Sequence, residues 1–412
     1  MKLINSWGNT SNKYIELSNA LKSPTLTIGN NNSYGDVSIP LGNNSYIPSP
    51  STKSNYINPF SSIENLMHNN NITFFGVPGK SNVTIGGAIA SDVHGKDGSW
   101  GGSFIKNIKS LKLVLANGDS IKCSREKNSE IFLTTVGGYG LTGSITGVEL
   151  NSNLTRFSEK YNNYLKKGSG FESLFNNFTN ENNEYSVGWI DLLNKERNWV
   201  FETSTPEKET VKNKVIQTKN DFEPALSLPF IGRNALQSMS YVNKIYYKIA
   251  KEGNSVKDRN KVLYPLSFVS NTKNISKKRK IIQIQFSLPK KNEKHIDNLI
   301  DVLIYKQVPL LCSLKKLSNN ETELNLSFIQ EGWTIAVDFS YINFNFESIR
   351  IFYKKLIELE GKIYLAKDSC LKSDEFREMY PNFESWSKII RTIDPDKMFQ
   401  SQMSKRLELK NW

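Results

Sequence analysis

Hydrophobic and polar positions change their spacing along this chain. Between residues 71 and 150, short apolar runs alternate with polar residues and are interrupted by glycine and proline, as in "NITFFGVPGKSNVTIGGAIASDVHG". Asn117 and Gly118 separate two such runs, and an Asn-Gly pair between alternating segments is a strong hairpin signal. The pattern predicts a β-rich domain over residues 1–150.

The second half of the chain mixes two periodicities. The segments "KIIQIQFSL", "PLLCSLKKL", "GWTIAVDFS" and "GKIYLAKDS" are typical of strands, whereas "EKHIDNLIDVLIYKQ" and "NFESIRIFYKKLIELEG" carry apolar residues at helical spacing. Residues Pro59–Asn70 predict a further short amphipathic helix. Together these segments predict an α+β fold, in which an antiparallel sheet is covered by helices.

Composition excludes several protein classes. The first residues, "MKLINSWGNTSNKY", lack the apolar run of a secretory signal, and no stretch has the roughly 18 apolar residues of a membrane span. The three cysteines, Cys123, Cys312 and Cys370, are far apart and form no CxxC motif, which argues against a disulfide framework and a metal cluster. We expect a cytoplasmic protein that binds no metal.

Net charge widens the choice of partners rather than narrowing it. A formal charge of +13 is compatible with nucleic acid, anionic lipid headgroups or phosphorylated substrates. The most basic run, Lys273–Phe286, leads into a strand pattern and is typical of a solvated approach to a sheet.

Three glycine clusters lie in the β-rich region, at Gly29–Asp36, Pro78–Lys96 and Thr134–Leu150. Glycine lets the backbone approach a ligand closely and aim successive N–H groups at an anion, so the clusters could line a groove for a pyrophosphate. No Rossmann fingerprint and no Walker motif is present in the sequence. Ordinary turn glycines would explain each cluster equally well.

The order and the local sequences of these clusters resemble those of the FAD-binding domain of the vanillyl-alcohol-oxidase superfamily. The segments are "SYGD", "TIGGAIASDVHGK", "LANGD" and "TVGGYGLTGSITGVEL". Later segments, including "WIDLL", "EGWTIAVDF", "GKIYLAKDS" and "IDPDKMFQSQMSKRLEL", are similar to the superfamily's oxidases of polyprenyl-phosphate-linked sugars. The resemblance covers most of Ser33–Leu409 and is weakest between Gly170 and Asn260.

The resemblance implies a two-domain, PCMH-type FAD-binding flavoprotein. Residues 1–150 would form the FAD-binding domain, 151–375 an α+β substrate or cap domain, and 376–412 a C-terminal segment that returns to the FAD domain. By analogy with the family, the cofactor contacts would be Ser33, Tyr34, Gly35, Gly79, Thr84, Gly86, Gly87, Ala88, Ser91, His94, Gly95, Gly138, Gly140, Thr142, Gly143 and Ile145.

Two departures from the family concern the cofactor. Asn32 stands where covalent members carry a flavin-linking histidine, and an amide has no nucleophilic ring nitrogen, so we expect non-covalent FAD. The chain is also shortened near residues 37–58, which puts cofactor affinity in question.

The catalytic set implied by the resemblance is Lys367, His94 and Tyr34. A cation such as Lys367 near the flavin would stabilise the negative charge that develops there as hydride arrives. His94 could accept a hydroxyl proton, with Tyr34, Lys96 and Lys367 as rival acceptors.

The substrate contacts implied by the resemblance lie mostly in the second half. Gln283 and Gln285 share one face of a strand, so both amides could project into one pocket. The remaining predicted contacts are Lys316, Tyr364, Lys96 and Trp189. Leu263, Thr334 and Ala336 replace a tyrosine, an asparagine and a cysteine of the family's pocket, so substrate identity is supported less well than flavin chemistry.

The implied function is FAD-dependent oxidation of a secondary alcohol on a sugar, phosphorylated or lipid-phosphate-linked, with hydride passing to flavin N5. The keto-sugar would then pass to a short-chain reductase, completing an epimerisation in cell-envelope polysaccharide biosynthesis. Peripheral attachment to the inner face of the membrane would suit a polyprenyl carrier. Two alternatives stay open. One is a soluble, oxygen-using aldonolactone or alditol oxidase, and the other is a basic nucleic-acid-binding or scaffold protein with a degenerate flavin domain.

Overall fold

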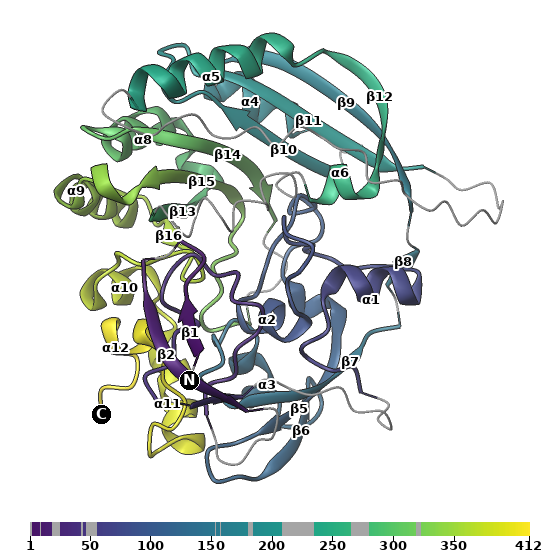
Figure 1. Ribbon diagram of the computed structural model, residues 1–412, viewed down its shortest axis with the longest axis vertical. Coiled ribbons are helices and arrows are strands. Elements are labelled where there is room, and N and C mark those ends of the chain that lie inside the picture. Colours follow the sequence, from purple (N-terminus) through teal and green to yellow (C-terminus); the bar gives the residue numbers. More distant parts are fainter. Residues whose placement is uncertain are drawn as a thin grey trace.

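An eight-stranded antiparallel sheet forms the upper half of the molecule (Figure 1). The computed structural model describes residues 2–8, 10–18, 25–42, 44–46, 56–152, 154–156, 158–179, 184–207, 235–264, 280–318 and 323–412. The strand order is β12-β9-β11-β10-β14-β15-β13-β16. The strands are β9 (Lys160–Ser169), β10 (Tyr185–Ile190), β11 (Asn198–Pro206), β12 (Gly253–Asp258), β13 (Ile281–Pro289), β14 (Pro309–Leu317), β15 (Gly332–Ser340) and β16 (Lys362–Ile363).

Helices cover one face of this sheet. Helices α4 (Phe171–Asn177), α8 (Ile296–Ile304) and α9 (Phe346–Glu358) share a hydrophobic core with alternate residues of the strands. In β13, Ile282, Ile284 and Phe286 belong to that core. Because side chains alternate along a strand, Gln283 and Gln285 face the opposite side. The predicted α+β fold, with an antiparallel sheet covered by helices, is confirmed.

Helices α5 (Ala235–Ile249) and α6 (Arg259–Leu263) lie beside the outer strands β9 to β12, and α5 is the outermost helix at the top of Figure 1. The structure contains, among its described helices, none that is long and apolar enough to cross a membrane.

The lower half is built from small sheets and short helices. Strands β5 (Ile108–Val114), β6 (Ser120–Ser124) and β7 (Ser144–Leu150) form one sheet, and β1 (Lys2–Asn5), β2 (Asn12–Ser18) and β3 (Asn44–Tyr46) form a second. A two-stranded sheet joins β4 (Ile72–Thr73) to β8 (Thr155–Arg156). The helices are α1 (Ile63–Asn70), α2 (Ile85–Ala90) and α3 (Ser129–Thr135), and η1 (Phe104–Asn107) is a 3-10 turn.

Two local predictions are confirmed in this half. Strands β5 and β6 pair antiparallel around Asn117 and Gly118, and Gly118 takes the positive φ of 88° that such a turn favours. Helix α1 begins after Ser62, whose side chain accepts the N–H of Asn65, and ends before Asn71 in the left-handed region.

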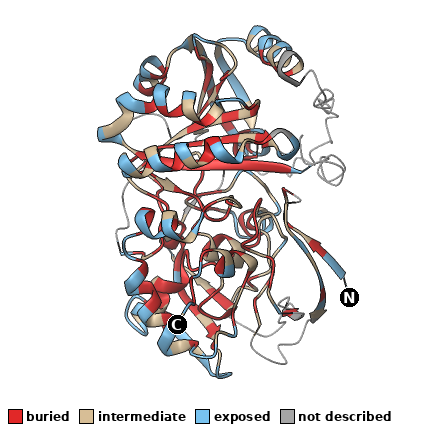
Figure 2. Ribbon diagram, turned by 90° about the vertical axis from the view of Figure 1, so that its left-hand side faces the viewer, coloured by how far each residue is buried: buried red, intermediate tan, exposed pale blue. Residues whose placement is uncertain are grey.

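Buried residues occur in both halves (Figure 2) and form two large hydrophobic clusters. One cluster extends from the eight-stranded sheet into the C-terminal helices, and the other lies in the lower half. The lower cluster is drawn mainly from residues 63–148 but also includes Val262, Leu263 and Tyr264, which come from far along the chain. The domain boundaries at residues 150 and 375 stay a prediction.

The C-terminal helices lie against the N-terminal part of the chain. They are α10 (Ser373–Met379), α11 (Phe383–Ile393) and α12 (Gln402–Arg406). Pro40 and Ser401 form a β-bridge, and the Arg406 guanidinium donates two hydrogen bonds of 2.8 Å to the Asp36 carboxylate. These contacts hold the two ends of the described chain together (Figure 1).

One predicted strand is much shorter than expected. In "GKIYLAKDS" only Lys362 and Ile363 are extended, as β16, and the chain then turns. The N–H groups of Lys367 and Asp368 both donate to the carbonyl oxygen of Tyr364, at 3.0 and 3.1 Å, so Tyr364 and Lys367 lie at the two ends of a tight turn rather than on one strand. Of the basic run, residues 273–279 lie outside the described residues.

Candidate active site

A large cavity lies between the uncovered face of the eight-stranded sheet and the glycine-rich loops of the lower half. It measures about 1670 Å³ when the open space at its mouth is included. Its walls come from residues 26–38, 59–60, 78–94 and 139–145, and from strands β13, β14 and β15 together with the turn that follows β16.

Polar side chains that the strand register aligns form the wall of the cavity on the sheet side. Gln285 lies opposite Ala336, and Ala336 opposite Ser313, so three strands present one row of side chains. In the next row, Gln283 lies opposite Asp338, and its amide donates to the Asp338 carboxylate at 2.6 Å. All of these residues except Asp338 line the cavity.

His94 lies against this wall. Its Nε2 is 2.7 Å from the side-chain nitrogen of Gln285, which also donates to Thr334 at 3.1 Å. His94 Nδ1 is buried and has no hydrogen-bond partner among the described residues. Burial, reinforced by Lys315 and Lys367, holds the pKa of His94 well below its ordinary value, so the imidazole is neutral at pH 7. Its Nδ1 is therefore the atom left for a ligand.

Lys367 and Tyr34 form a second polar group in the cavity wall. The Lys367 ammonium lies 4.2 Å from the centroid of the Tyr34 ring, a cation–π contact. Burial lowers the pKa of Lys367 to about 8, although Asp338 opposes that shift. Burial and the Asp338 charge raise the pKa of Tyr34 well above 10, so its hydroxyl stays protonated.

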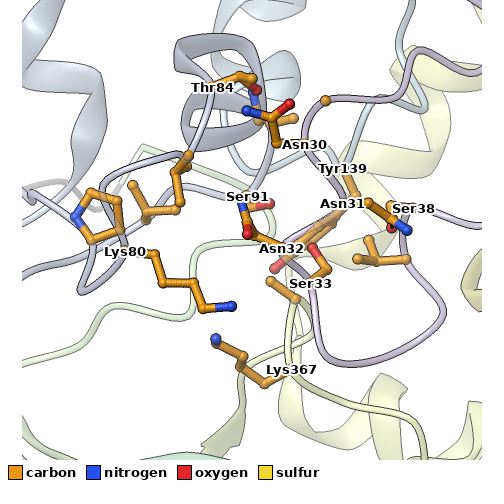
Figure 3. Close-up of a pocket in the computed structure, with 18 of the residues that line it drawn as sticks. Asn30, Asn31, Asn32, Ser33, Ser38, Lys80, Thr84, Ser91, Tyr139 and Lys367 are labelled. Carbon is orange, nitrogen blue, oxygen red and sulfur yellow. Dashed lines mark hydrogen bonds between the residues drawn. The ribbon is translucent and has the colours of Figure 1, made fainter. Parts of the chain in front are cut away.

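Lys80 lines the same part of the cavity, and the sequence analysis did not single it out. Its ammonium points toward that of Lys367 (Figure 3) and lies 4.0 Å from the centroid of the Trp7 ring. Two cations that face one another across a cavity favour an anionic ligand between them. Lys80 is the only charged residue in the glycine-containing "PGKSN" segment. Its charge is the one feature of that segment that could have indicated an anion-binding role.

Strand β14 brings Lys315 to the cavity and not the predicted Lys316. Lys315 shares its face with Ser313, whereas Lys316 shares the helix-covered face with Leu314 and lies opposite Trp333, which packs on Phe175 of α4. The motif "SLKKLS" contains both lysines. Neighbouring residues of a strand point to opposite faces of the sheet, so only one of the two can face the cavity. Burial lowers the pKa of Lys315 to about 8.

Two other predicted substrate contacts lie outside the cavity lining. The Lys96 ammonium donates to the Val262 carbonyl at 2.6 Å and lies 3.9 Å from a carboxylate oxygen of Glu202. Trp189 packs its ring against Tyr246 of α5, 4.7 Å between centroids.

Most of the other predicted residues do line the cavity. Those that line it are Ser33, Tyr34, Gly79, Thr84, Gly86, Gly87, Ser91, His94, Gly140, Gly143, Ile145, Gln283, Gln285, Tyr364 and Lys367. The predicted cofactor contacts outside the lining are Gly35, Ala88, Gly95, Gly138 and Thr142. Lining residues that the sequence analysis did not propose as contacts include Asn31, Lys80, Tyr139, Ser313 and Lys315.

The glycines in and beside the cavity lining serve two purposes. A Cβ at Gly79 would have nothing within 4 Å, so this backbone faces open space. A Cβ at Gly86 would come within 2.9 Å of the Pro59 side chain, and one at Gly35 would overlap the carbonyl oxygen of Asp368. Gly86 and Gly35 are therefore required by close packing, whereas Gly79 leaves its backbone open to a ligand.

The cavity fits a large polar cofactor that carries negative charge. Buried Thr27 Oγ1 and His94 Nδ1 lie at its wall without hydrogen-bond partners in the described structure. Lys80, Lys315 and Lys367 supply positive charge, and Asn30, Asn31 and Asn32 add amides along one side (Figure 3). Such a wall matches the phosphate, ribityl and flavin groups of FAD. Among the described residues no group of three or more His, Cys, Asp and Glu side chains is arranged to hold a metal ion.

The fold and this cavity, together with comparisons to known proteins, identify the class. Residues 342–407 match the D-arabinono-1,4-lactone oxidase family. Over 348 residues the chain is 29% identical to decaprenylphosphoryl-β-D-ribose oxidase of Mycolicibacterium smegmatis, covering 81% of this chain and 75% of that protein. These similarities support an FAD-linked oxidase, an oxidoreductase that acts on CH–OH groups.

Similarity to the mycobacterial oxidase just named agrees with the similarity of the later motifs to oxidases of polyprenyl-phosphate-linked sugars. A shorter stretch of 68 residues is 37% identical to an uncharacterised protein from the mprA 5′ region of Streptomyces coelicolor, covering 16% of this chain and 18% of that protein.

Proposed function

We propose that the protein oxidises a secondary alcohol of a sugar, phosphorylated or lipid-phosphate-linked, to a keto-sugar. The observation that carries the proposal is the convergence on one cavity of a neutral His94, the Gln283 and Gln285 amides and the Lys367 cation. Similarity to an oxidase of a lipid-phosphate-linked sugar supports the same substrate class.

The cavity residues have separate tasks in this proposal. FAD, when bound, supplies the hydride acceptor at flavin N5. In this proposal the Gln285 amide is turned so that its oxygen accepts from the Nε2–H of His94, which leaves Nδ1 unprotonated. His94 Nδ1, which no described residue engages, then binds the substrate hydroxyl and accepts its proton. Gln283 and Gln285 orient the sugar hydroxyls from the sheet. Lys367 stabilises the negative charge that develops in the cavity.

FAD binds without a covalent link in this proposal, in a two-domain, PCMH-type arrangement. Asn32 lies at the cavity wall, where its side-chain nitrogen donates to the Asn82 carbonyl at 3.3 Å, and an amide cannot form the covalent bond. Ser33, Thr84, Ser91 and the backbone of Gly79 surround the same space and are the proposed cofactor contacts there.

The reaction is the first half of an epimerisation. A ketone left by oxidation can be reduced from the opposite face, so the proposed partner is a short-chain reductase that acts on the product. A lipid-linked substrate places the enzyme at the inner face of a membrane as a peripheral protein.

One absorbance experiment tests the proposal. Purified protein is expected to be yellow, to release unmodified FAD on denaturation, and to lose its flavin absorbance anaerobically when the correct sugar is added. Colourless protein that cannot be reconstituted with FAD, and that binds DNA or RNA in a strongly salt-dependent way, would favour the nucleic-acid-binding alternative instead.

A soluble aldonolactone oxidase is the second candidate, because residues 342–407 match the D-arabinono-1,4-lactone oxidase family. That function predicts rapid reoxidation of the reduced flavin by oxygen and activity on a free lactone. The absence from the sequence of an "HWGK"-like motif, which is common in those oxidases, argues against it. Oxygen consumption with free lactones and with phosphorylated sugars separates the two functions.

A further inference from the structure

Helix α5 carries an exposed apolar stripe. Tyr241, Ile245 and Ile249 are 67%, 40% and 59% exposed, although isoleucine is among the residues most often buried. They are spaced four residues apart and therefore lie on one side of the helix. We call these three side chains the α5 stripe. It runs along the outermost helix of the molecule (Figure 1).

Lysines follow the edge of the stripe. Lys244 and Lys248 lie one residue before Ile245 and Ile249, so they occupy the adjacent line of the helix surface, and Lys251 follows at its end. Residues 235–251 contain no Asp or Glu. The next acid, Glu252, accepts the backbone N–H of Lys167 at 2.9 Å. The surface is therefore both apolar and positively charged.

The opposite side of α5 is firmly packed, so the stripe is not needed to hold the helix in place. Met239 and Asn243 are 2% and 7% exposed, and the Asn243 amide donates to the Asp191 carboxylate at 2.7 Å. Tyr246 is 40% exposed, but its ring packs against Trp189 of β10.

The stripe lies on the side of the sheet that holds the cavity. Trp189 is the register partner of Ser313, which lines the cavity, and cross-strand partners project from the same face. The neighbouring Gly188 faces the other way, because a Cβ there would meet Leu174 of α4. The Trp189–Tyr246 contact therefore joins the cavity side of the sheet to α5.

We propose that the α5 stripe and its lysines form the surface by which the protein docks on an anionic phospholipid bilayer. Tyrosine and isoleucine side chains enter the interfacial region of such a bilayer, while the lysine ammonium groups stay among the phosphates. This inference deepens the proposed function, and it rests on that function only for the lipid-linked substrate that docking would bring near the cavity.

Charge favours a bilayer over a second copy of the chain. In a two-fold dimer built on this surface, the patch would face itself and bring Lys244, Lys248 and Lys251 of one copy toward the same lysines of the other. An anionic headgroup layer instead complements all three charges, and the whole chain carries a net charge of +13.

Co-sedimentation of the FAD-loaded protein with vesicles tests the proposal. We expect binding to vesicles of equal parts phosphatidylglycerol and phosphatidylcholine, and not to pure phosphatidylcholine. I245S/I249S should abolish most binding. K244Q/K248Q should lower the partition coefficient about 30-fold, since two lysines near an anionic surface contribute roughly 2 kcal/mol.

Matched variants separate docking from folding and from general charge. Y164S/V256S removes two residues that are 42% and 57% exposed on the opposite face of the same sheet, and K294Q/K388Q removes equal charge elsewhere. Both should bind vesicles like the wild type, and every variant should keep its flavin spectrum. Equal loss with the control pairs, no binding by the wild type, or a dimer that I245S/I249S dissociates would overturn the proposal. The vesicles contain no sugar, so failure here would leave flavin reduction by sugar untouched.

Discussion

His94 is one of three histidines in the chain, and it is buried between the Gln285 amide and the rings of Phe328 and Tyr364. His94→Ala removes the only part of this group that can accept a hydroxyl proton. We expect flavin reduction by sugar to slow by about 10²–10⁴-fold, the usual contribution of a general base, measured by anaerobic stopped-flow absorbance.

Phe328→Leu is the matched control for His94→Ala. Phe328 stacks on His94 with 5.4 Å between ring centroids, so this change loosens the same packing without removing a proton acceptor. The control should lower the thermal unfolding midpoint at least as much as His94→Ala does. Equal slowing of flavin reduction by both variants would show that packing, and not the imidazole, matters.

Lys367 predicts a pH dependence. Its pKa is lowered to about 8 by burial, so the side chain is a cation below pH 8 and neutral above it. Flavin reduction should therefore slow as pH rises through about 8, while the low pKa of His94 keeps the imidazole neutral over that range.

Lys367→Arg checks that assignment, because a guanidinium stays charged well above pH 8. The variant should shift the alkaline loss of activity upward, whatever its maximal rate. An unchanged pH profile would assign the titration to another group, and Lys315, whose pKa is also about 8, is the next to test.

At the scale of single elements, the face of the sheet to which each residue of β14 points decides which of its two lysines reaches the cavity. Lys315→Met should weaken FAD binding or slow flavin reduction, because Lys315 faces the cavity from β14. Lys316→Met is the matched neighbour on the other face of the same strand and should change either quantity less than twofold. Fluorescence titration of FAD and rapid kinetics measure both. A larger effect at Lys316 would reverse the assignment.

The glycine-rich segments offer a similar pair. Gly86→Ala should destabilise the protein by about 1–3 kcal/mol, because the new methyl group would come within 2.9 Å of Pro59. Gly79→Ala points into open space, so we expect an unfolding free energy within about 0.5 kcal/mol of the wild type but weaker FAD binding. Chemical denaturation and FAD titration give the two readouts. Normal FAD affinity in Gly79→Ala would place the cofactor elsewhere.

At the scale of the whole molecule, Arg406 joins distant segments. Its guanidinium pairs with Asp36 at 2.8 Å and with Asp368 at 2.9 Å. Asp36 lies two residues after Tyr34, and Asp368 directly follows Lys367. One side chain from the last helix therefore fixes the separation of two cavity residues.

Arg406→Ala should cost about 3–5 kcal/mol of unfolding free energy, because it leaves two buried carboxylates without their counter-charge. Lys291→Ala is the control, since it breaks an exposed pair with Glu360 and should cost less than about 1 kcal/mol. Denaturant melts compare them. Restored stability in R406L/D36N/D368N would confirm that unpaired charge, and not lost packing, causes the defect.

The sequence alone determined the class of fold, the flavin chemistry and much of the cavity wall. These features are local. Two-residue alternation places Gln283 and Gln285 on one face of β13, an Asn-Gly pair makes the β5–β6 hairpin, and the glycine-rich wording around His94 indicates a cofactor loop. The strand face and the hairpin can be predicted because neighbouring residues supply the physical cause, whereas the cofactor loop was indicated by resemblance to a known family.

Only the tertiary structure decided which candidates meet. Alternation cannot say whether Lys315 or Lys316 faces the cavity, because that depends on which side of β14 the helices cover. Lys80 reaches the cavity through the path of its loop, and Trp189 turns to α5 because Leu174 fills the other side of β10. The exposed side of α5 likewise followed only from knowing which side is packed. Long-range packing sets these relations, and no local pattern encodes them.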